Sequence, residues 1–398
     1  MHPKNSFLFL SVLVLAVLTL TPNNYAAERG FDDKEIRIGS WGPQTGPAAP
    51  WGNIARGPGI LFSLVNEEGG IHGRKIKHFI RDDQYNPAQT KAVAKELVER
   101  QGVLAVTSGL GSSCVLAVKD YLAEKKVISV GMCTGAKELV YPLNPYLFSC
   151  FDLFGDEASV LTKYVVEKLK IKKIGFFYQN DPMGWDALAG AKERMATYGL
   201  KFLAEIPVEP TEKDLTSQIM KFKASGAEAV IMQVAPTPGV VAVKTAAAIG
   251  YKPQWVSADT LGDMPVMYKI TGGLWEGVIT GGKTVEPTGN HPLVVKYREA
   301  TKRLSPDEPF TGFFLAGIMF AEPLVYALKK VGRNLSTEAL LQALNSVKDF
   351  QGVGPQTTWT PQEHQGVDST RVYKCGPNGS YVLLQDWTPN ELTKWKKK

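Results

Sequence analysis

Short apolar runs alternate with amphipathic segments along most of the chain. The runs are rich in Val, Ile and Phe, and many end next to Gly, Pro or Asp, as buried strands of a parallel sheet do. The segments between them carry Ala and Leu at helical spacing. This alternation predicts an α/β fold with helices on both faces of its sheets. The predicted strands are 36–41, 75–81, 103–108, 127–131, 173–178, 203–208, 229–234 and 254–258. The first predicted helical segment ends at Glu68 and is kinked at Pro58. The other predicted helices are 87–101, 113–124, 156–169, 188–198, 215–225 and 240–249.

The alternation is interrupted twice. It pauses at 141–154 and breaks again near 281–291, and the last hundred residues are helical and then rich in strands and turns. We therefore predict two doubly wound parallel-sheet lobes, with the interruptions as hinge crossings. The predicted lobes are residues 34–149 with 281–370, and residues 150–280 with 371–398. Such sheets bind ligands beyond the carboxyl ends of their strands, so candidate site residues are sought directly after strands.

The first 27 residues predict a secretory signal peptide. A short polar start is followed by an apolar run from Phe7 to Leu20, and then by the small residues Ala26 and Ala27. The run is short for a transmembrane helix. Asn24 or Tyr25 occupies the cleavage position that prefers a small residue, so an uncleaved anchor is the alternative.

The distribution of charged residues, histidines and cysteines argues against a nucleic-acid-binding protein and against a metal-binding protein. The 398 residues carry a formal charge of +6, but the basic residues are spread along helical faces and cluster only in the final lysines. This distribution predicts a solvated surface and no nucleic-acid partner. The five His are scattered and no Cys-x-x-Cys occurs, so no metal site is predicted. Export permits disulfides, and the alternatives for the four Cys are disulfide bonds or buried free thiols. These are Cys114, Cys133, Cys150 and Cys375.

The segment Gly109–Cys114 follows a predicted strand and opens a predicted helix. It nearly matches the dinucleotide fingerprint, but Cys114 replaces the third glycine and no acid lies about 20 residues further on, so no nucleotide cofactor is predicted. A helix N-terminus still presents free N–H groups, and Ser112 and Ser113 add hydroxyl donors. Such a turn suits a small anion such as a carboxylate. The alternative is that one serine only caps the helix.

Four further residues follow strands. Thr134 comes after the strand 127–131 and would reach the same carboxylate, or would serve only as a turn residue. Asp259 follows 254–258 in the second lobe and would pair with a ligand ammonium, or would cap a helix. Trp51 and Trp185 would form walls of an apolar pocket, or would cover edges of the core.

Catalytic motifs are missing from the sequence. It contains no Gly-x-Ser-x-Gly elbow, no His-Glu-x-x-His and no P-loop, and neither Cys114 nor Cys133 has a His nearby in sequence. We therefore predict a binding protein that is not an enzyme and needs no cofactor.

Several short motifs together resemble the periplasmic leucine/isoleucine/valine-binding protein family, the type I solute-binding proteins of ATP-driven (ABC) importers. The resemblance runs from about Ile36 to Trp387. It is carried by the turn Gly42–Gly46, by Asn66-x-x-Gly-Gly-Ile-x-Gly-Arg74, by Asp82-Asp83 with Asn86-Pro87, by Gly111–Ser113, and by Thr134 with Glu138-Leu139.

The resemblance implies two lobes that are joined by three crossovers and close on a ligand. It also implies that Ser112, Ser113 and Thr134 hold the ligand's α-carboxylate, that Asp259 takes its ammonium, and that Trp51 lines the side-chain pocket. Three departures weaken the ammonium site. The family's acid is commonly Glu, its second-lobe Tyr has no counterpart in Gln233–Pro236, and Met183 replaces a second-lobe aromatic, with Trp185 two residues on.

The function predicted from the sequence is therefore an extracytoplasmic solute-binding protein of an ABC transporter. The predicted ligand is a branched-chain or other apolar amino acid, or a similar small carboxylate. The alternatives are an aromatic or amine-free carboxylate, and a ligand-sensing receptor domain. The expected partners are the ligand and a membrane permease, and the protein is expected to be a monomer in the periplasm.

Overall fold

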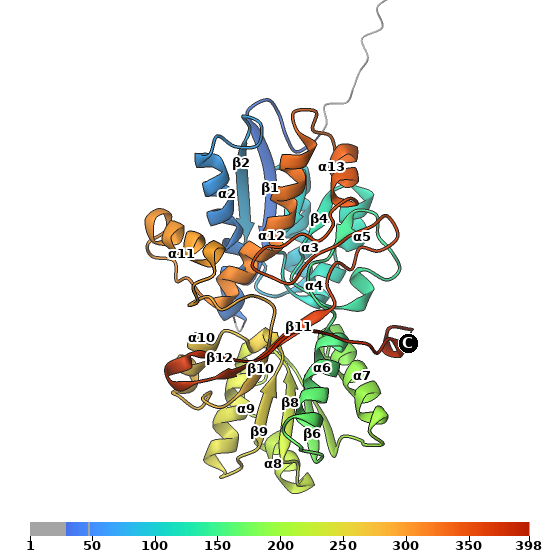
Figure 1. Ribbon diagram of the computed structural model, residues 1–398, viewed down its shortest axis with the longest axis vertical. Helices are drawn as coiled ribbons and strands as arrows, with labels where there is room; N and C mark the ends of the chain where they lie inside the picture. Colours follow the sequence, from blue (N-terminus) through green and yellow to red (C-terminus); the bar gives the residue numbers. More distant parts are fainter. Residues whose placement is uncertain (1–28, 47, 398) are drawn as a thin grey trace, which may run out of the picture.

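The computed structural model describes residues 29–46 and 48–397 and has two lobes, each built on its own sheet (Figure 1). The predicted signal segment 1–27 lies outside these residues. The sheet of the first lobe has the strand order β2-β1-β3-β4-β5, and every pairing in it is parallel. Its strands are β1 (Glu35–Trp41), β2 (Lys75–Arg81), β3 (Ala105–Thr107), β4 (Ile128–Val130) and β5 (Leu147–Phe148).

The sheet of the second lobe is parallel with an antiparallel edge. Its order is β12-β11-β10-β9-β8-β6-β7, and β11 runs antiparallel to both β10 and β12. The predicted fold class, two doubly wound lobes, is confirmed. The strands are β6 (Ile174–Gln179), β7 (Ala204–Val208), β8 (Ala229–Gln233), β9 (Gln254–Ser257), β10 (Ile279–Gly282), β11 (Ser369–Cys375) and β12 (Tyr381–Pro389).

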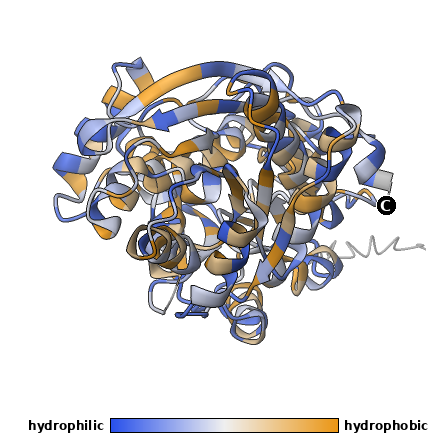
Figure 2. Cartoon of the chain, turned by 90° about the horizontal axis from the view of Figure 1, so that it is seen from below, coloured by the Kyte–Doolittle hydropathy of each residue, from blue (hydrophilic) through white to orange (hydrophobic). Residues whose placement is uncertain are grey.

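Helices cover both sheets. In the first lobe they are α1 (Asn53–Arg56), α2 (Pro58–Glu67), α3 (Pro87–Glu99), α4 (Ser112–Leu116), α5 (Lys119–Glu124), α11 (Pro292–Leu304), α12 (Gly312–Val331) and α13 (Thr337–Leu344). In the second lobe they are α6 (Phe154–Glu167), α7 (Pro182–Thr197), α8 (Thr216–Ser225), α9 (Pro236–Ala248) and α10 (Met264–Thr271). Viewed from below, the helices carry both hydrophobic and hydrophilic residues (Figure 2).

Local chemistry explains where several helices begin. Asn86 caps α3, because its side chain accepts hydrogen bonds from two N–H groups of the first turn, and a proline follows at the first helical position. Asp181 caps α7, because its side chain accepts the N–H of Gly184, and α7 starts six residues earlier than the predicted Leu188. The predicted helix 113–124 is divided into α4 and α5, with Ala117 ending the first piece.

Within the described residues the chain passes between the lobes three times: between β5 and α6, between β10 and α11, and between α13 and β11 (Figure 1). Consequently each lobe is assembled from separate stretches of sequence. The predicted boundaries at 280/281 and 370/371 fall inside β10 and β11, which belong to the second sheet.

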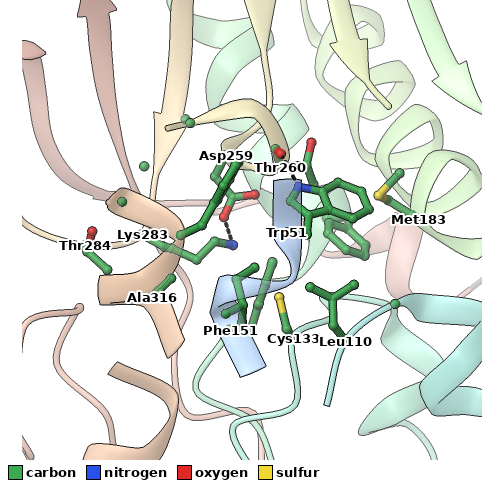
Figure 3. A pocket seen from close by; sticks show the side chains of 18 of the residues that line it. Trp51, Leu110, Cys133, Phe151, Met183, Asp259, Thr260, Lys283, Thr284 and Ala316 are labelled. Atoms are coloured by element: carbon green, nitrogen blue, oxygen red, sulfur yellow. Dashed lines mark hydrogen bonds and ion pairs between the residues drawn. The ribbon is translucent and has the colours of Figure 1, made fainter. Parts of the chain in front are cut away.

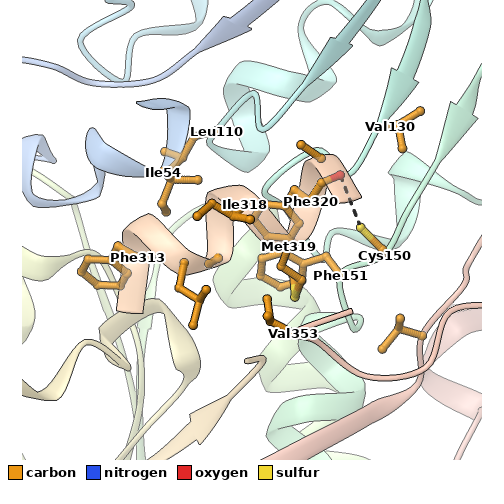
Figure 4. Close-up of a cluster of buried hydrophobic side chains, with 14 of the residues drawn as sticks. Ile54, Leu110, Val130, Cys150, Phe151, Phe313, Ile318, Met319, Phe320 and Val353 are labelled. Atoms are coloured by element: carbon orange, nitrogen blue, oxygen red, sulfur yellow. Dashed lines mark hydrogen bonds between the residues drawn. The ribbon is translucent and has the colours of Figure 1, made fainter. Parts of the chain in front are cut away.

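The helix α12 forms the centre of the first lobe. It is long and apolar enough to cross a membrane by length and composition, but most of it is buried inside the protein. Ile318, Met319 and Phe320 of α12 pack among residues from several other segments (Figure 4). Gly317 lets α12 approach α1 so closely that a Cβ there would collide with the carbonyl oxygen of Ile54. This close contact fixes the loop before α1, which carries Trp51, against the core.

Candidate functional site

A cavity lies between the two lobes, where the strands of both sheets end (Figure 3). About 730 Å³ around it is free of protein atoms, a volume that includes open solvent, and the enclosed cavity volume is about 70 Å³ in this closed arrangement. Most of its lining is apolar or aromatic and comes from both lobes. The apolar lining residues are Trp51, Ile54, Tyr85, Leu110, Phe151, Phe154, Met183, Val285, Phe313, Ala316, Tyr373 and Tyr381.

The turn before α4 supplies one polar wall. Gly111 has a φ of 99°, which favours glycine, and a Cβ there would lie 2.7 Å from the ring of Tyr85. Ser112 lines the cavity, and its hydroxyl is 2.9 Å from that of Thr134. Ser113 is the next residue on the helix, about 100° further round. It is only half-buried and is not among the lining residues.

Thr134 lies behind Ser112. It is fully buried, does not line the cavity, and its hydroxyl oxygen accepts the N–H of Ala136 at 3.2 Å. A hydroxyl has one donor and two lone pairs. If Thr134 donates its proton to Ser112, the proton of Ser112 is free to point into the cavity. The pair therefore offers a ligand carboxylate one oriented hydroxyl, beside the N–H groups that begin α4.

Asp259 is also at the cavity, but it already has a cationic partner. It begins a short 3₁₀ turn (Asp259–Leu261) directly after β9. Its side chain forms an ion pair with the ammonium of Lys283, the residue that follows β10 (Figure 3). Sequence reasoning did not find Lys283. The segment Gly281–Thr284 has no recognisable motif, and the pairing depends on β9 and β10 lying side by side.

Lys283 is surrounded by further groups. Its side chain is 12% exposed, and its Nζ lies 2.9 Å from the centroid of the Phe151 ring and 3.8 Å from a carboxylate oxygen of Asp152. Glu157 accepts the backbone N–H of Asp259 at 2.7 Å. Asp152 and Glu157 are therefore two buried acids close to the ion pair, and neither of them lines the cavity.

Burial controls the protonation of this cluster. It raises the pKa of the Glu157 carboxyl well above its usual value, with a further increase from the charge of Asp152 and a decrease from Lys283. Burial also raises the pKa of Asp152, which the charge of Lys283 and a hydrogen bond from Thr370 oppose. The pKa of Lys283 is lowered by burial, which outweighs the raising effect of the neighbouring acids Asp152 and Glu157. A protonated Glu157 therefore limits the negative charge that Lys283 has to balance.

The two predicted tryptophans lie in different environments. Trp51 is 5% exposed, lines the cavity, and donates from its Nε1 to the carbonyl oxygen of Thr260 at 2.8 Å, across the lobes. Trp185 is 53% exposed, bonds to Asn180, and does not line the cavity. Because Asp181 starts α7 early, Trp185 is a helical residue on the outer side, and Met183 is the residue that faces the cavity.

The lobes touch at several points around the cavity. Besides the bond from Trp51, the Nε2 of Gln179 in the second lobe donates to the hydroxyl of Tyr85 at 3.1 Å. The backbone N–H of Lys137 donates to a carboxylate oxygen of Asp186 at 2.8 Å. These contacts form only when the lobes are together, so the structure represents a closed arrangement.

The four cysteines are free thiols in the structure. Burial raises the pKa of Cys114 and of Cys133 to about 12, so both remain protonated. Cys133 contributes to the lining of the cavity as a small apolar group. Of the two alternatives for the cysteines, the structure has the buried thiols.

Comparison with known proteins gives the family. Residues 35–380 match the family model described as "Periplasmic binding protein". The chain belongs to the periplasmic binding protein family. The resemblance seen in the sequence is thereby confirmed. Members of this family bind small-molecule ligands outside the cytoplasm and work with ABC transporters, and they are not enzymes.

Individual members of the periplasmic binding protein family match over most of their length. The Leu/Ile/Val-binding protein homolog 1 of Brucella suis is 25% identical over 387 residues, which is 95% of this chain and 99% of that protein. A fatty acid ABC transporter substrate-binding protein from Thermomonospora curvata has a TM-score of 0.81 at 24% identity, covering 93% of this chain and 95% of the other. A branched chain amino acid ABC transporter protein from Thermus thermophilus with bound valine has a TM-score of 0.81 at 19% identity, covering 92% and 98%. The two structures share the fold of this chain.

Proposed function

We propose that this chain captures a small apolar carboxylate between its lobes and delivers it to the membrane permease of an ABC importer. The observation that carries the proposal is the cavity between the lobes, which is apolar over most of its surface and has the hydroxyl of Ser112 at one wall. An apolar body would contact the aromatic residues, and the carboxylate would accept hydrogen bonds from Ser112 and from the start of α4.

The relatives support this ligand class. The names of the Brucella, Thermus and Thermomonospora proteins refer to leucine, isoleucine, valine or fatty acids. All of these are carboxylates with an apolar body. The cavity of this chain combines the same two features, so an apolar amino acid and an amine-free acid both fall within the proposed class.

Capture would work by closure. Trp51 and Ser112 belong to the first lobe, and Met183 and Asp259 to the second, so a ligand between them contacts both lobes. A ligand that binds the closed form better shifts the protein toward it. The closed form would then be the one that a permease recognises, and residues 1–27 would direct the chain to the periplasm.

A thermal-shift screen of the purified protein tests the proposal. The panel contains short aliphatic and aromatic carboxylates, with and without an amino group, and matched alcohols and amides as controls. A ligand at 100 times its dissociation constant adds about 2.7 kcal/mol to the apparent stability. We expect carboxylates to raise the melting temperature and the matched alcohols to have no effect. If no apolar carboxylate raises it, the proposed function is wrong.

Two serine variants then locate the carboxylate. Ser112→Ala removes the hydroxyl that faces the cavity and should weaken binding by about 1–3 kcal/mol. Ser113→Ala is the matched control, because Ser113 is not among the lining residues. Isothermal titration should show the loss only for Ser112→Ala. Equal affinities for the two variants would remove this turn from the binding site.

A further inference from the structure

Lys283 and Asp259 are the only charged side chains among the described residues that line the cavity. They follow the neighbouring strands β9 and β10, and their ion pair lies among the aromatic residues that line the cavity (Figure 3). An acid in this position is the group that would bind the ammonium of an amino acid. Here the chain supplies that ammonium itself.

A second ammonium would be unfavourable at this place. A ligand amine that reached Asp259 would lie next to the Nζ of Lys283, and two like charges a few ångströms apart in a buried site repel strongly. Asp152 and Glu157 do not offer an alternative, because neither lines the cavity. Glu157 is bonded to the backbone N–H of Asp259, and Asp152 accepts the hydroxyl of Thr370 and faces Lys283.

Lys283 itself is held in place. Its Nζ lies over the ring of Phe151, in a cation–π geometry, with carboxylates of Asp152 and Asp259 on its other sides. Phe151 and Asp152 lie at the first crossing between the lobes, and Lys283 lies at the second. Moving the lysine aside for a ligand amine would therefore break contacts at two crossings and leave a buried charge without its partners.

We propose that the ligand of this cavity is an apolar carboxylate that has no amino group, and that Lys283 occupies the place of the amine. This inference rests on the proposed function and names its substrate class. The carboxylate binds beside Ser112, and the remainder of the ligand lies against the aromatic and aliphatic lining without a charged group at the end near Asp259.

Matched ligand pairs test the inference in the unmodified protein. The pairs are leucine with 4-methylpentanoate and phenylalanine with 3-phenylpropanoate, which differ only in the amino group. Isothermal titration should show the amine-free member of a pair binding at least about tenfold more tightly. Tighter binding of the amino acids would overturn the inference and leave the proposed function standing. Absence of binding by all four would overturn the proposed function and the inference with it.

A charge-removal variant makes the test sharper. Lys283→Met keeps the length of the side chain but frees the Asp259 carboxylate, so the preference should shift toward the amino acid by about tenfold or more. The matched control is the double variant Asp259→Asn/Lys283→Met, which has no carboxylate to offer and should keep the preference for the amine-free acid. The double variant removes both charges of the Asp259–Lys283 pair and leaves Asp152 only its hydrogen bond from Thr370, so it tests the inference with one buried carboxylate fewer to destabilise the fold than in Lys283→Met. An unchanged preference in Lys283→Met, or a double variant that gains amino-acid binding, would overturn the inference.

Discussion

Glu322 provides a test of the structure that needs no ligand. It lies in the middle of α12 and is 6% exposed. One of its carboxylate oxygens accepts the hydroxyl of Tyr297 at 2.7 Å, and the other accepts the backbone N–H of Val353 at 3.0 Å. Glu322→Gln keeps the shape and is neutral at every pH. Its amide can donate to the Tyr297 oxygen and accept from Val353, so the variant mimics the protonated acid.

The expected magnitude follows from the pKa. Burial raises the pKa of Glu322 from 4.5 to about 7, although its two hydrogen bonds lower it. Between these values the unfolded chain loses the proton and the folded chain retains it, so the stability of the wild-type protein falls as the pH rises. The full loss is about 3 kcal/mol and is complete above pH ~7. The glutamine variant has no such loss, so its stability relative to wild type should rise by about 2.5 kcal/mol between pH ~5 and pH ~8, because a small part of the loss has already occurred at pH ~5.

Urea unfolding at these two pH values measures the difference. Glu338→Gln, at an exposed position of α13, is the matched control and should show the same pH dependence as the wild type. If Glu322→Gln and wild type instead change in parallel between the two pH values, the carboxyl is not buried as the structure has it, and the packing of α12 against α11 would have to be revised.

Two further predictions concern the site and its support. Thr134→Val should weaken binding of the best carboxylate by about 1 kcal/mol in isothermal titration, because the Thr134 hydroxyl orients Ser112. Thr134→Ser keeps a hydroxyl and should bind as tightly as the wild type. Equal affinities of the Val and Ser variants would show that this hydroxyl has no role in binding. Gly317→Ala should lower stability by about 1–3 kcal/mol in a urea titration, because its Cβ would meet the backbone of α1. Gly59→Ala, a helical position where the nearest atom to a Cβ is 3.7 Å away, should be neutral or stabilising, and a similar loss in both variants would contradict the close packing.

Much of the fold follows from the sequence because buried parallel strands are continuous apolar runs. The segment predicted as a strand at 75–81 is β2 residue for residue, and the other predicted strands differ only at their ends. Helix starts were less predictable. The early start of α7 depends on the side chain of Asp181 accepting a hydrogen bond, which a periodicity argument that begins at Leu188 does not include.

The site was predictable only in part. The rule that ligands bind beyond strand ends leads to Ser112, Asp259 and Trp51, and the structure brings all three to one cavity. The rule does not reveal that the charge of Asp259 is already paired with that of Lys283. Lys283 belongs to a crossing segment, and its acidic partners come from distant parts of the sequence, so no local pattern distinguishes it from a surface lysine.

The three crossings have a consequence for how the polypeptide can be divided. The second sheet is completed by β11 and β12 from the last part of the chain, and a hydrogen bond from Asn390 to Asp156 and the buried Trp395 attach the tail to α6. The first lobe likewise needs α12, which follows almost all of the second lobe in sequence. No single uninterrupted stretch of coding sequence contains either lobe. A product truncated before α12 would leave both lobes incomplete, and a one-lobe protein could be obtained only by rejoining separate segments through new linkers.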